Sequence, residues 1–431
     1  MRDVLRSFFN PNAGAARAPH HIFWAGLAVR LLYITLAHTY RVRPAEDHFQ
    51  FGWEAGRIAR AMVPGHGYAD PFSNSWMPHT GPTAWLAPLY PLLLAGIFRF
   101  FGVFTPQSAW VLFAIQSVFS AATALAIWAI AIRCFSRRVA LWSAWLWALY
   151  PAAMQYAVRW PWETAITTAL FTFALALALR LRGLGEDEPT GSPFASWLLF
   201  GLLWGAIALA NPALLVFLPV CGLWILAGPA PRAAAVRGAL LAAAGLLLCI
   251  APWIARNEAV FHRFIPMRGN FGAELYMGNG PGSAGLLMEY LHPFQDPVQL
   301  RRYAELGEAA YVAERGAAAK AFIAAHPAHF LANIFRRIFF FWAGVPSDQP
   351  WYIQGARALN FVFLSLAGLL GLALALRNRV PAAGLFAWAF LLLPVPYYLV
   401  TVHARFRHPL EPLIAILGVY LFQSAKPRQH G

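Results

Sequence analysis

Long apolar runs separated by short polar segments place the strongest constraint on what this chain can fold into. Many of them approach the length of about 20 helical residues that crosses the hydrocarbon core of a bilayer. A backbone in that core must satisfy its hydrogen bonds within the segment, which favours α-helices. Hydrophobic residues make up 59% of the 431 positions and charged residues only 12%. The sequence therefore predicts an all-α integral membrane protein.

Basic residues at the borders of the apolar runs predict how the helices cross the membrane. The run 85–102 contains Pro88 and Pro91, and we expect it not to span. Most of the other bordering Arg and Lys then fall on one side, which the positive-inside rule makes cytoplasmic. The sequence thus predicts about ten transmembrane helices with both termini in the cytoplasm. The expected spans are 22–40, 107–132, 139–158, 164–179, 195–211, 213–228, 238–255, 356–376, 381–400 and 409–423.

The formal net charge of +15 would suggest nucleic-acid binding in a soluble protein. Here most Arg residues border apolar runs and act as topology signals, so we expect no nucleic-acid partner. The three cysteines, Cys134, Cys221 and Cys249, lie in or beside predicted spans. We therefore expect them to be small apolar fillers, without a disulfide or metal cluster.

The predicted spans divide the chain into three parts. Residues 1–255 form a transmembrane module whose first outer loop is 41–106, residues 256–354 form an outer, extracytoplasmic loop domain, and residues 355–431 form the C-terminal transmembrane helices. Within the outer domain, we expect the glycine-rich stretch 268–285 to be irregular and 299–325 to be helical. We expect 329–344 to be a helix lying flat against the membrane.

The first outer loop carries a polar amphipathic segment. Read as a helix over about 49–62, it places Phe51, Ala55, Ile58 and Met62 on one stripe, with Glu54 at the polar boundary. Such a helix is typical of the membrane interface, where a lipid-borne substrate could be met.

Several short motifs occur in a characteristic order along the chain. They are Gly-His-Gly-Tyr, GPTAW, PLYPLLLAGIFRFFG, RWPWET, ANPALL, APWIARN, GNFGAELYMGN and HARFRHPLEP. This order resembles the GT-C superfamily of membrane glycosyltransferases, especially glycosyltransferase family 39, with its protein O-mannosyltransferase and aminoarabinose transferase relatives. The resemblance implies a GT-C-like fold and transfer of a sugar from a polyprenyl-phosphate carrier. The acceptor would be a protein, a lipid or a glycan, at an active site facing outward from the cytoplasmic (inner) membrane.

The resemblance also implies that an acidic residue of the first outer loop activates the acceptor. In this chain the acidic pair is inverted as Glu46-Asp47, and Glu54 follows in FGWEAGRIARAM. Asp47 and Glu54 therefore both remain candidates for the catalytic base. Each also has a structural explanation, since Asp47 with Gln50 could cap a helix and Glu54 with Arg57 could form a surface ion pair.

Phosphate chemistry predicts a second group of residues. A sugar phosphate already carries a good leaving group, so the site needs a base for the acceptor and cations for the departing phosphate. Arg suits phosphate through its two-pronged guanidinium. The candidate phosphate- or substrate-binding residues are His403, Arg405 and Arg407, with Arg256, Asn257 and Arg57 as further candidates. The structural alternative is an interfacial anchor in which Arg407 pairs with Glu411.

Glu163, in RWPWET, is the third candidate catalytic carboxylate. It could orient the acceptor or hold a divalent metal ion, or it could be a favourable first-turn residue of a helix. Metal ligands are otherwise unknown, because His20, His21, His66 and His79 show no metal-ligand spacing and are expected to be loop or interface residues. No cofactor is certain from the sequence.

Other functions are compatible with many spans and outer arginines. A transporter or flippase for lipid-linked sugars would be expected to show inverted repeats, which are not visible here. A non-catalytic scaffold would not need carboxylates and arginines on one side. A polymerase or ligase of surface polysaccharide would use similar chemistry. Among the aromatic residues, Trp53, Trp76, Trp160 and Trp162 fall on the outer side and could stack on sugar rings.

Overall fold

The computed structural model describes residues 19–42, 51–185, 193–347 and 349–425. These residues are mostly helical, and their only pairing of extended backbone is an isolated bridge between Ala69 and Pro82. The all-α expectation is confirmed for this part of the chain. Asp47 and the preceding Glu46 lie outside the described residues.

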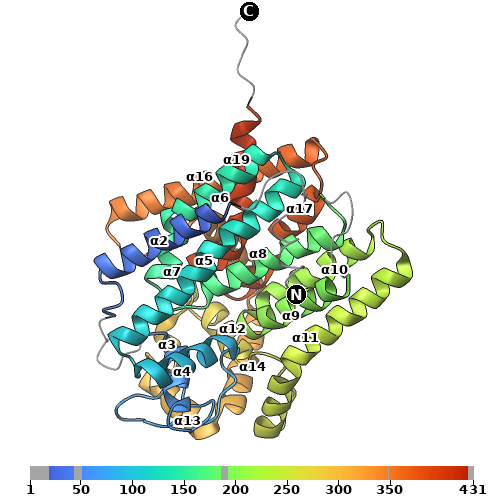
Figure 1. Cartoon of the computed structure of the whole chain (residues 1–431). Helices are drawn as coiled ribbons and strands as arrows, with labels where there is room; N and C mark the ends of the chain where they lie inside the picture. Colours follow the sequence, from blue (N-terminus) through green and yellow to red (C-terminus); the bar gives the residue numbers. More distant parts are fainter. Residues whose placement is uncertain (1–18, 43–50, 186–192, 348, 426–431) are drawn as a thin grey trace, which may run out of the picture.

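A bundle of apolar helices forms the upper part of the molecule in Figure 1, and the helices of the predicted outer loops gather at its lower end. The bundle contains α2 (His20–Leu36), α5 (Pro106–Cys134), α6 (Arg137–Leu149), α7 (Pro151–Val158), α8 (Thr164–Leu181), α9 (Pro193–Ala210), η1 (Pro212–Phe217), α10 (Leu218–Leu226), α11 (Arg232–Phe261), α16 (Trp351–Arg377), α17 (Ala383–Leu392), α18 (Val395–Leu399), η3 (Ala404–Leu410) and α19 (Glu411–Gln423). The outer-loop helices are α3 (Trp53–Met62), α4 (Leu89–Phe101), α12 (Phe271–Asn279), η2 (Glu289–Leu291), α13 (Pro297–Leu306), α14 (Glu308–Ala325) and α15 (Pro327–Ala343).

Among the described residues, four helices, α5, α8, α11 and α16, are both long enough and apolar enough to cross a bilayer. They correspond to four of the predicted spans and make this a membrane protein. The other predicted spans are shorter or interrupted helices. The span predicted at 139–158, for example, divides into α6 and α7 at Tyr150, which takes the extended conformation (φ −72°, ψ 115°) that a following proline favours.

The outer-loop helices differ in part from the expectations. The glycine-rich stretch is not irregular throughout, because α12 occupies its centre; that expectation was wrong there. The helical prediction for 299–325 is confirmed by α13 and α14. In the first loop the helix begins at Trp53, after a sharp entry in which Gly52 and Trp53 have φ of 87° and 48°.

Within the bundle, Arg30 of α2 is fully buried and acts as a cross-link between helices. Its guanidinium donates to Ser120 Oγ of α5 at 3.1 Å and to the Ala148 carbonyl of α6 at 2.7 Å. This arginine in the middle of a predicted span is therefore paired with polar groups inside the bundle. Cys134 and Cys221 are buried and Cys249 is partly buried, as expected of small apolar fillers.

Two sets of hydrogen bonds join the first outer loop to later parts of the chain. Glu308, buried at the start of α14, accepts hydrogen bonds from Thr83 Oγ1, from the Ala84 amide (2.6 Å) and from Tyr303 Oη (2.8 Å). Arg256, near the end of α11, donates to the carbonyls of Thr83 (2.7 Å) and Tyr68 (2.8 Å). The two outer segments consequently pack as one assembly over the end of the bundle.

Candidate functional site

Glu54 lies in the first turn of α3, where the helix dipole favours a negative charge. Its Oε1 lies 3.0 Å from Nε2 of His292, which follows η2 in the outer loop domain. The two side chains are 18% and 10% exposed, respectively. Burial alone would raise the pKa of Glu54, but the hydrogen bond and charge of His292, a backbone hydrogen bond and the charge of Arg405 hold it below the usual value. Glu54 is therefore an ionised, partly accessible carboxylate at neutral pH.

Arg405 and Glu163 face each other across the same region. Glu163 precedes α8, and its Oε2 lies 4.0 Å from Nη1 of Arg405 in η3; both side chains are about one quarter exposed. The guanidinium carbon of Arg405 lies 4.2 Å from the centre of the Trp162 ring. Among the described residues, Nε of Arg405 has no hydrogen-bond partner. Arg405 is thus held in place by an aromatic ring while keeping donor capacity.

A third carboxyl group, Glu274 of α12, belongs to this site although the sequence reasoning did not select it. Asn270 Nδ2 donates to its Oε1 at 3.0 Å. Burial raises the pKa of Glu274 and the charge of Glu54 adds to the increase, while Arg268, His292 and Arg405 partly oppose it. Two carboxyl groups with oppositely shifted pKa values therefore share the field of Arg405 and His292, an arrangement typical of sites that move protons.

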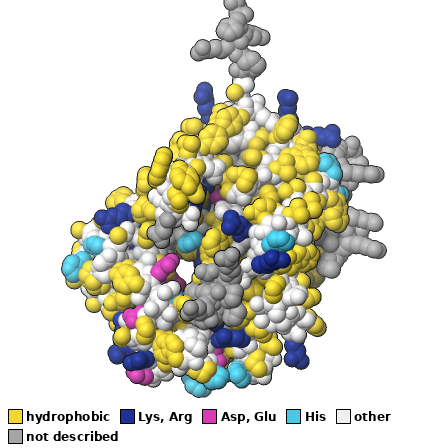
Figure 2. Space-filling model, turned by 90° about the vertical axis from the view of Figure 1, so that its left-hand side faces the viewer, with side chains coloured by type: hydrophobic (Ala, Val, Ile, Leu, Met, Phe, Trp, Pro, Cys, Tyr) yellow, Lys and Arg dark blue, Asp and Glu magenta, His cyan; other side chains and the backbone are white. Residues whose placement is uncertain are grey.

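Tryptophan side chains form one wall beside these charges. The Trp160 and Trp162 rings stack at 4.7 Å between centres, 9° from parallel, and Trp53 lies 4.9 Å from Trp162. The ring of His403 meets Trp162 edge-on at 5.4 Å, and its Nδ1 accepts from the Arg405 amide at 3.3 Å. Three of the four predicted outer tryptophans therefore come together, next to His403 and Arg405. Figure 2 shows a face of the molecule on which acidic, basic and histidine side chains lie around a hollow.

The remaining predicted phosphate-binding residues are occupied within the protein. Arg407, 1% exposed, donates to Ser365 Oγ (2.9 Å) and to Glu411 Oε1 (3.3 Å). Arg57 is fully buried. Its Nε donates a hydrogen bond to the Ser73 carbonyl at 2.8 Å, and its guanidinium lies over the Phe294 ring.

Arg256 and Asn257 are likewise engaged, as both hold the backbone of the outer segments. Arg256 binds the carbonyls named above, and Asn257 Nδ2 donates to the Ile265 carbonyl at 2.9 Å. The structure thus brings together Glu54, Glu163, His403 and Arg405, whereas Arg57, Arg256, Asn257 and Arg407 bind other groups of the protein.

Comparison with known proteins gives a fold but no sequence family. No family model matches the chain, and no curated protein matches its sequence. Among solved structures, it is similar to the oligosaccharyltransferase of Archaeoglobus fulgidus in the apo form, with a TM-score of 0.56, 14% identity and 94% of this chain covered. It is also similar to AglB from the same organism in complex with an inhibitory peptide and a dolichol-phosphate, with a TM-score of 0.51, 14% identity and 93% coverage.

These similarities define the fold of the chain. It shares the helical fold of these archaeal oligosaccharyltransferases, in agreement with the GT-C-like fold that the motifs imply. It spans about half the length of the archaeal oligosaccharyltransferases, since the match covers 50% of each of those chains.

Proposed function

We propose that this protein is a glycosyltransferase that moves a sugar from a polyprenyl-phosphate donor to an acceptor on the outer face of the cytoplasmic membrane. The observation that carries the proposal is the meeting of an ionised carboxylate, Glu54, with Arg405, whose guanidinium keeps free donor capacity, beside a tryptophan wall. The fold adds support, because the similar AglB was captured with a dolichol-phosphate, a lipid phosphate of the polyprenyl class.

The proposed reaction is a direct displacement with inversion at the anomeric carbon. The acceptor oxygen attacks this carbon, a new carbon–oxygen bond forms, and the bond to the carrier phosphate breaks with its electron pair left on the phosphate. Glu54 or Asp47 takes the acceptor proton. Arg405, with His403 beside it, stabilises the charge that develops on the phosphate. Glu163, 4.0 Å from Arg405, orients the acceptor or holds a divalent metal ion.

We further propose a topology of about ten spans, with both termini in the cytoplasm and the site facing outward. Residues from four predicted outer segments, Glu54, Glu163, His292 and Arg405, come together at one site. Residues predicted to lie in or next to cytoplasmic loops also meet, because Gly185 packs against Arg133, and Gly228, at the end of a predicted span, packs against Arg182. The 256–354 segment, as a separate outer domain, would cover the site through His292 and α12.

The test is release of polyprenyl phosphate from a panel of polyprenyl-phosphate sugars by the purified protein in liposomes. Wild type is compared with Asp47→Asn, Glu54→Gln and the double variant. Glu314→Gln, which changes the ion pairs of a surface carboxylate with Arg302 and Arg315, is the matched control. We expect turnover by wild type and by the control, and its collapse in the variant that lacks the base.

The opposite outcome would favour the transporter. It would be absence of turnover with every donor, together with movement of the carrier across the bilayer that the three variants leave intact.

A further inference from the structure

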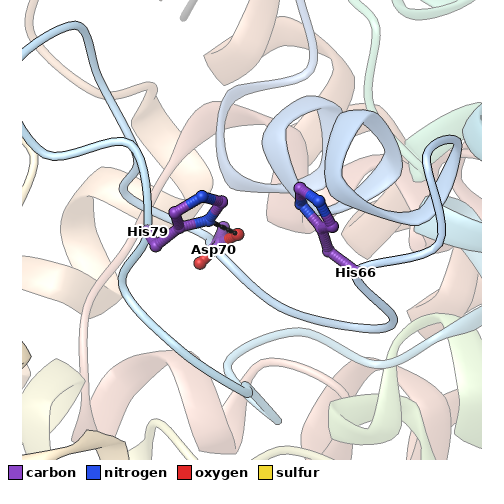
Figure 3. Close-up of side chains that lie close together, drawn as sticks. All are labelled: His66, Asp70 and His79. Carbon is purple, nitrogen blue, oxygen red and sulfur yellow. Dashed lines mark hydrogen bonds and ion pairs between the residues drawn. The ribbon is translucent and has the colours of Figure 1, made fainter.

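Beyond the opposite end of α3 from Glu54, three side chains that can ligate a metal converge. Asp70 lies between His66 and His79, and one ligand atom from each of the three lies within 4.8 Å of the others. Figure 3 shows the three side chains turned toward one another from separate stretches of the first outer loop. Sequence spacing alone had suggested loop residues, because the ligands are brought together by the course of the loop and not by a helical interval.

Asp70 is the fixed member of this cluster. Its side chain is 6% exposed, and Oδ1 accepts from the amides of Thr80 (2.7 Å) and Gly81 (3.0 Å). Asp70 also adopts a left-handed conformation, with φ of 61°. The second oxygen, Oδ2, lies 3.1 Å from Nδ1 of His79. The backbone therefore holds one carboxylate oxygen and directs the other at the imidazoles, as outer hydrogen bonds do for metal-bound carboxylates.

The two histidines are accessible and their rings are close. The ring centres of His66 and His79 lie 5.1 Å apart, and His79 is 65% exposed. An Asp70–His79 pair alone would not involve His66, which makes no side-chain hydrogen bond within the described part of the chain. The cluster lines a cleft of about 450 Å³. Arg60 also lines this cleft, and its guanidinium donates a hydrogen bond to Ser73 Oγ at 2.7 Å.

We propose that His66, Asp70 and His79 bind a divalent transition-metal ion, best matched by Zn²⁺. Two imidazole nitrogens and a carboxylate oxygen are a ligand set that zinc accepts at about 2.0–2.2 Å, so small side-chain rotations close the site. The cleft leaves a coordination position open to water. The ion ties the two ends of the segment 66–79 together, and this segment leads directly to Thr83 and Ala84, which Glu308 holds.

Metal binding to the full-length protein, in lipid nanodiscs and without an affinity tag, tests this proposal. The protein is stripped with a chelator and titrated with Zn²⁺ by calorimetry, and with Co²⁺ by visible absorption. We expect one equivalent per chain. His66→Gln and His79→Gln should each weaken binding by about 100-fold or more, because even second-shell changes cost about 10–100-fold. His326→Gln, an exposed histidine elsewhere in the outer domain, should bind as wild type does.

A second readout reports on the loop itself. Zn²⁺ should slow amide hydrogen exchange over residues 63–82 in wild type and in His326→Gln, and not in His66→Gln. His66 and His79 are exposed, so their substitution leaves the packed core intact. Absence of binding by wild type, or equal binding by His66→Gln, would overturn the proposal, and neither result would contradict the roles proposed for Glu54 and Arg405 in sugar transfer.

Discussion

Arg405 and Arg407 are two residues apart, yet they occupy opposite environments. Arg405 lies over Trp162 with its side chain one quarter exposed, whereas the Arg407 side chain is 1% exposed and bonded to Ser365 and Glu411. The 3-10 turn of η3 points them in different directions. The sequence grouped them as one phosphate cradle because spacing along a loop cannot tell which side chain faces inward.

Substitution should separate the two roles. Arg405→Ala should lower turnover by about 10²–10³-fold, the effect of losing a donor to a developing charge, with little change in melting temperature. The turnover of Arg405→Lys should lie between that of wild type and that of Arg405→Ala, because an ammonium group keeps the charge but lacks the planar fork of donors. Arg407→Ala should instead destabilise the fold by about 3–5 kcal/mol, since Glu411 loses one partner of a buried ion pair.

Turnover and thermal unfolding measured on the same preparations check this pair, with the exposed Arg302→Ala as control. A fall in melting temperature for Arg405→Ala equal to that for Arg407→Ala would contradict the assignment of Arg405 to the site.

His292 controls the protonation of Glu54, so its loss should move the pH profile. Its hydrogen bond and charge help hold the pKa of Glu54 down. A base acts only when ionised, so activity is lost as pH falls through that pKa. In His292→Ala the pKa rises, and the acidic limb of kcat/KM should shift to higher pH. His292→Gln, which keeps an N–H donor without a charge, should shift it less.

The profile is measured as kcat/KM against pH, with His326→Gln as the matched histidine control. An acidic limb that stays in place in His292→Ala would exclude Glu54 as the base and leave Asp47.

How far the site was predictable follows from where its residues lie. Glu54 belongs to the first outer loop, and Glu163 and Arg405 stand beside apolar runs, so the predicted topology places all three on one side. Glu274 and His292 belong to the long outer loop, and their proximity to Glu54 depends on how that loop folds back. The one available signal was that Glu274 stands inside the GNFGAELYMGN motif.

At the scale of elements, α12 shows why a glycine-rich stretch misled the sequence reasoning. Glycine commonly marks irregular backbone, but here it allows close helix packing. A Cβ on Gly272 would collide with the Val312 carbonyl and with Gly316 of α14, and one on Gly278 would collide with the Val400 carbonyl. The glycines of α12 therefore serve contacts with distant parts of the chain, which a local pattern does not reveal.

Glu308 is the residue on which the packing of α14 against the first outer loop depends. Its carboxylate accepts from Thr83, Ala84 and Tyr303, and Glu308→Ala would leave these buried donors without an acceptor. Each such donor costs about 1–3 kcal/mol. The variant should melt earlier and lose amide protection over 83–84 and α14, whereas the exposed Glu314→Ala should not.

The free energy of unfolding should fall as pH rises through the pKa of Glu308, because burial disfavours its charged form. Burial raises the pKa of Glu308, although its three hydrogen bonds and Arg256 partly oppose the increase. A carboxyl group with a raised folded-state pKa contributes stability that is complete below its unfolded value of 4.5 and is lost as pH rises through the folded value. Amide protection of α14 should therefore decline over that window in wild type. A protection that rises with pH would contradict the role given to Glu308.

At the scale of the whole molecule, hydropathy identified the class of protein and the four long spans, because bilayer thickness sets a length that a sequence can display. The other predicted spans are shorter or interrupted helices, such as α6 and α7, so length alone does not decide whether they cross. The predicted topology then rests on how Arg and Lys are distributed among the loops. Which side each loop lies on depends on whether α4 crosses the membrane.

Labelling of single cysteines would settle the path of the chain around α4. This helix has 13 residues, about 20 Å at 1.5 Å per residue, so it would need its flanking residues to complete a crossing of a core of about 30 Å. The α5 helix that follows has 29 residues, about 44 Å, and can cross it. Ser75 and Gln107, on either side of α4, should therefore lie outside, while Arg137, beyond α5, should lie in the cytoplasm. All three positions are exposed.

In intact cells, an impermeant maleimide should label Ser75→Cys and Gln107→Cys, and should label Arg137→Cys only after the membrane is permeabilised. Wild type, whose cysteines are buried or partly buried, supplies the background. Protection of Gln107→Cys with labelling of Ser75→Cys would mean that α4 and its flanks do cross. Glu163 and Arg405 would then lie on the opposite side of the membrane from the start of α4, which their convergence with Glu54 on one site does not allow.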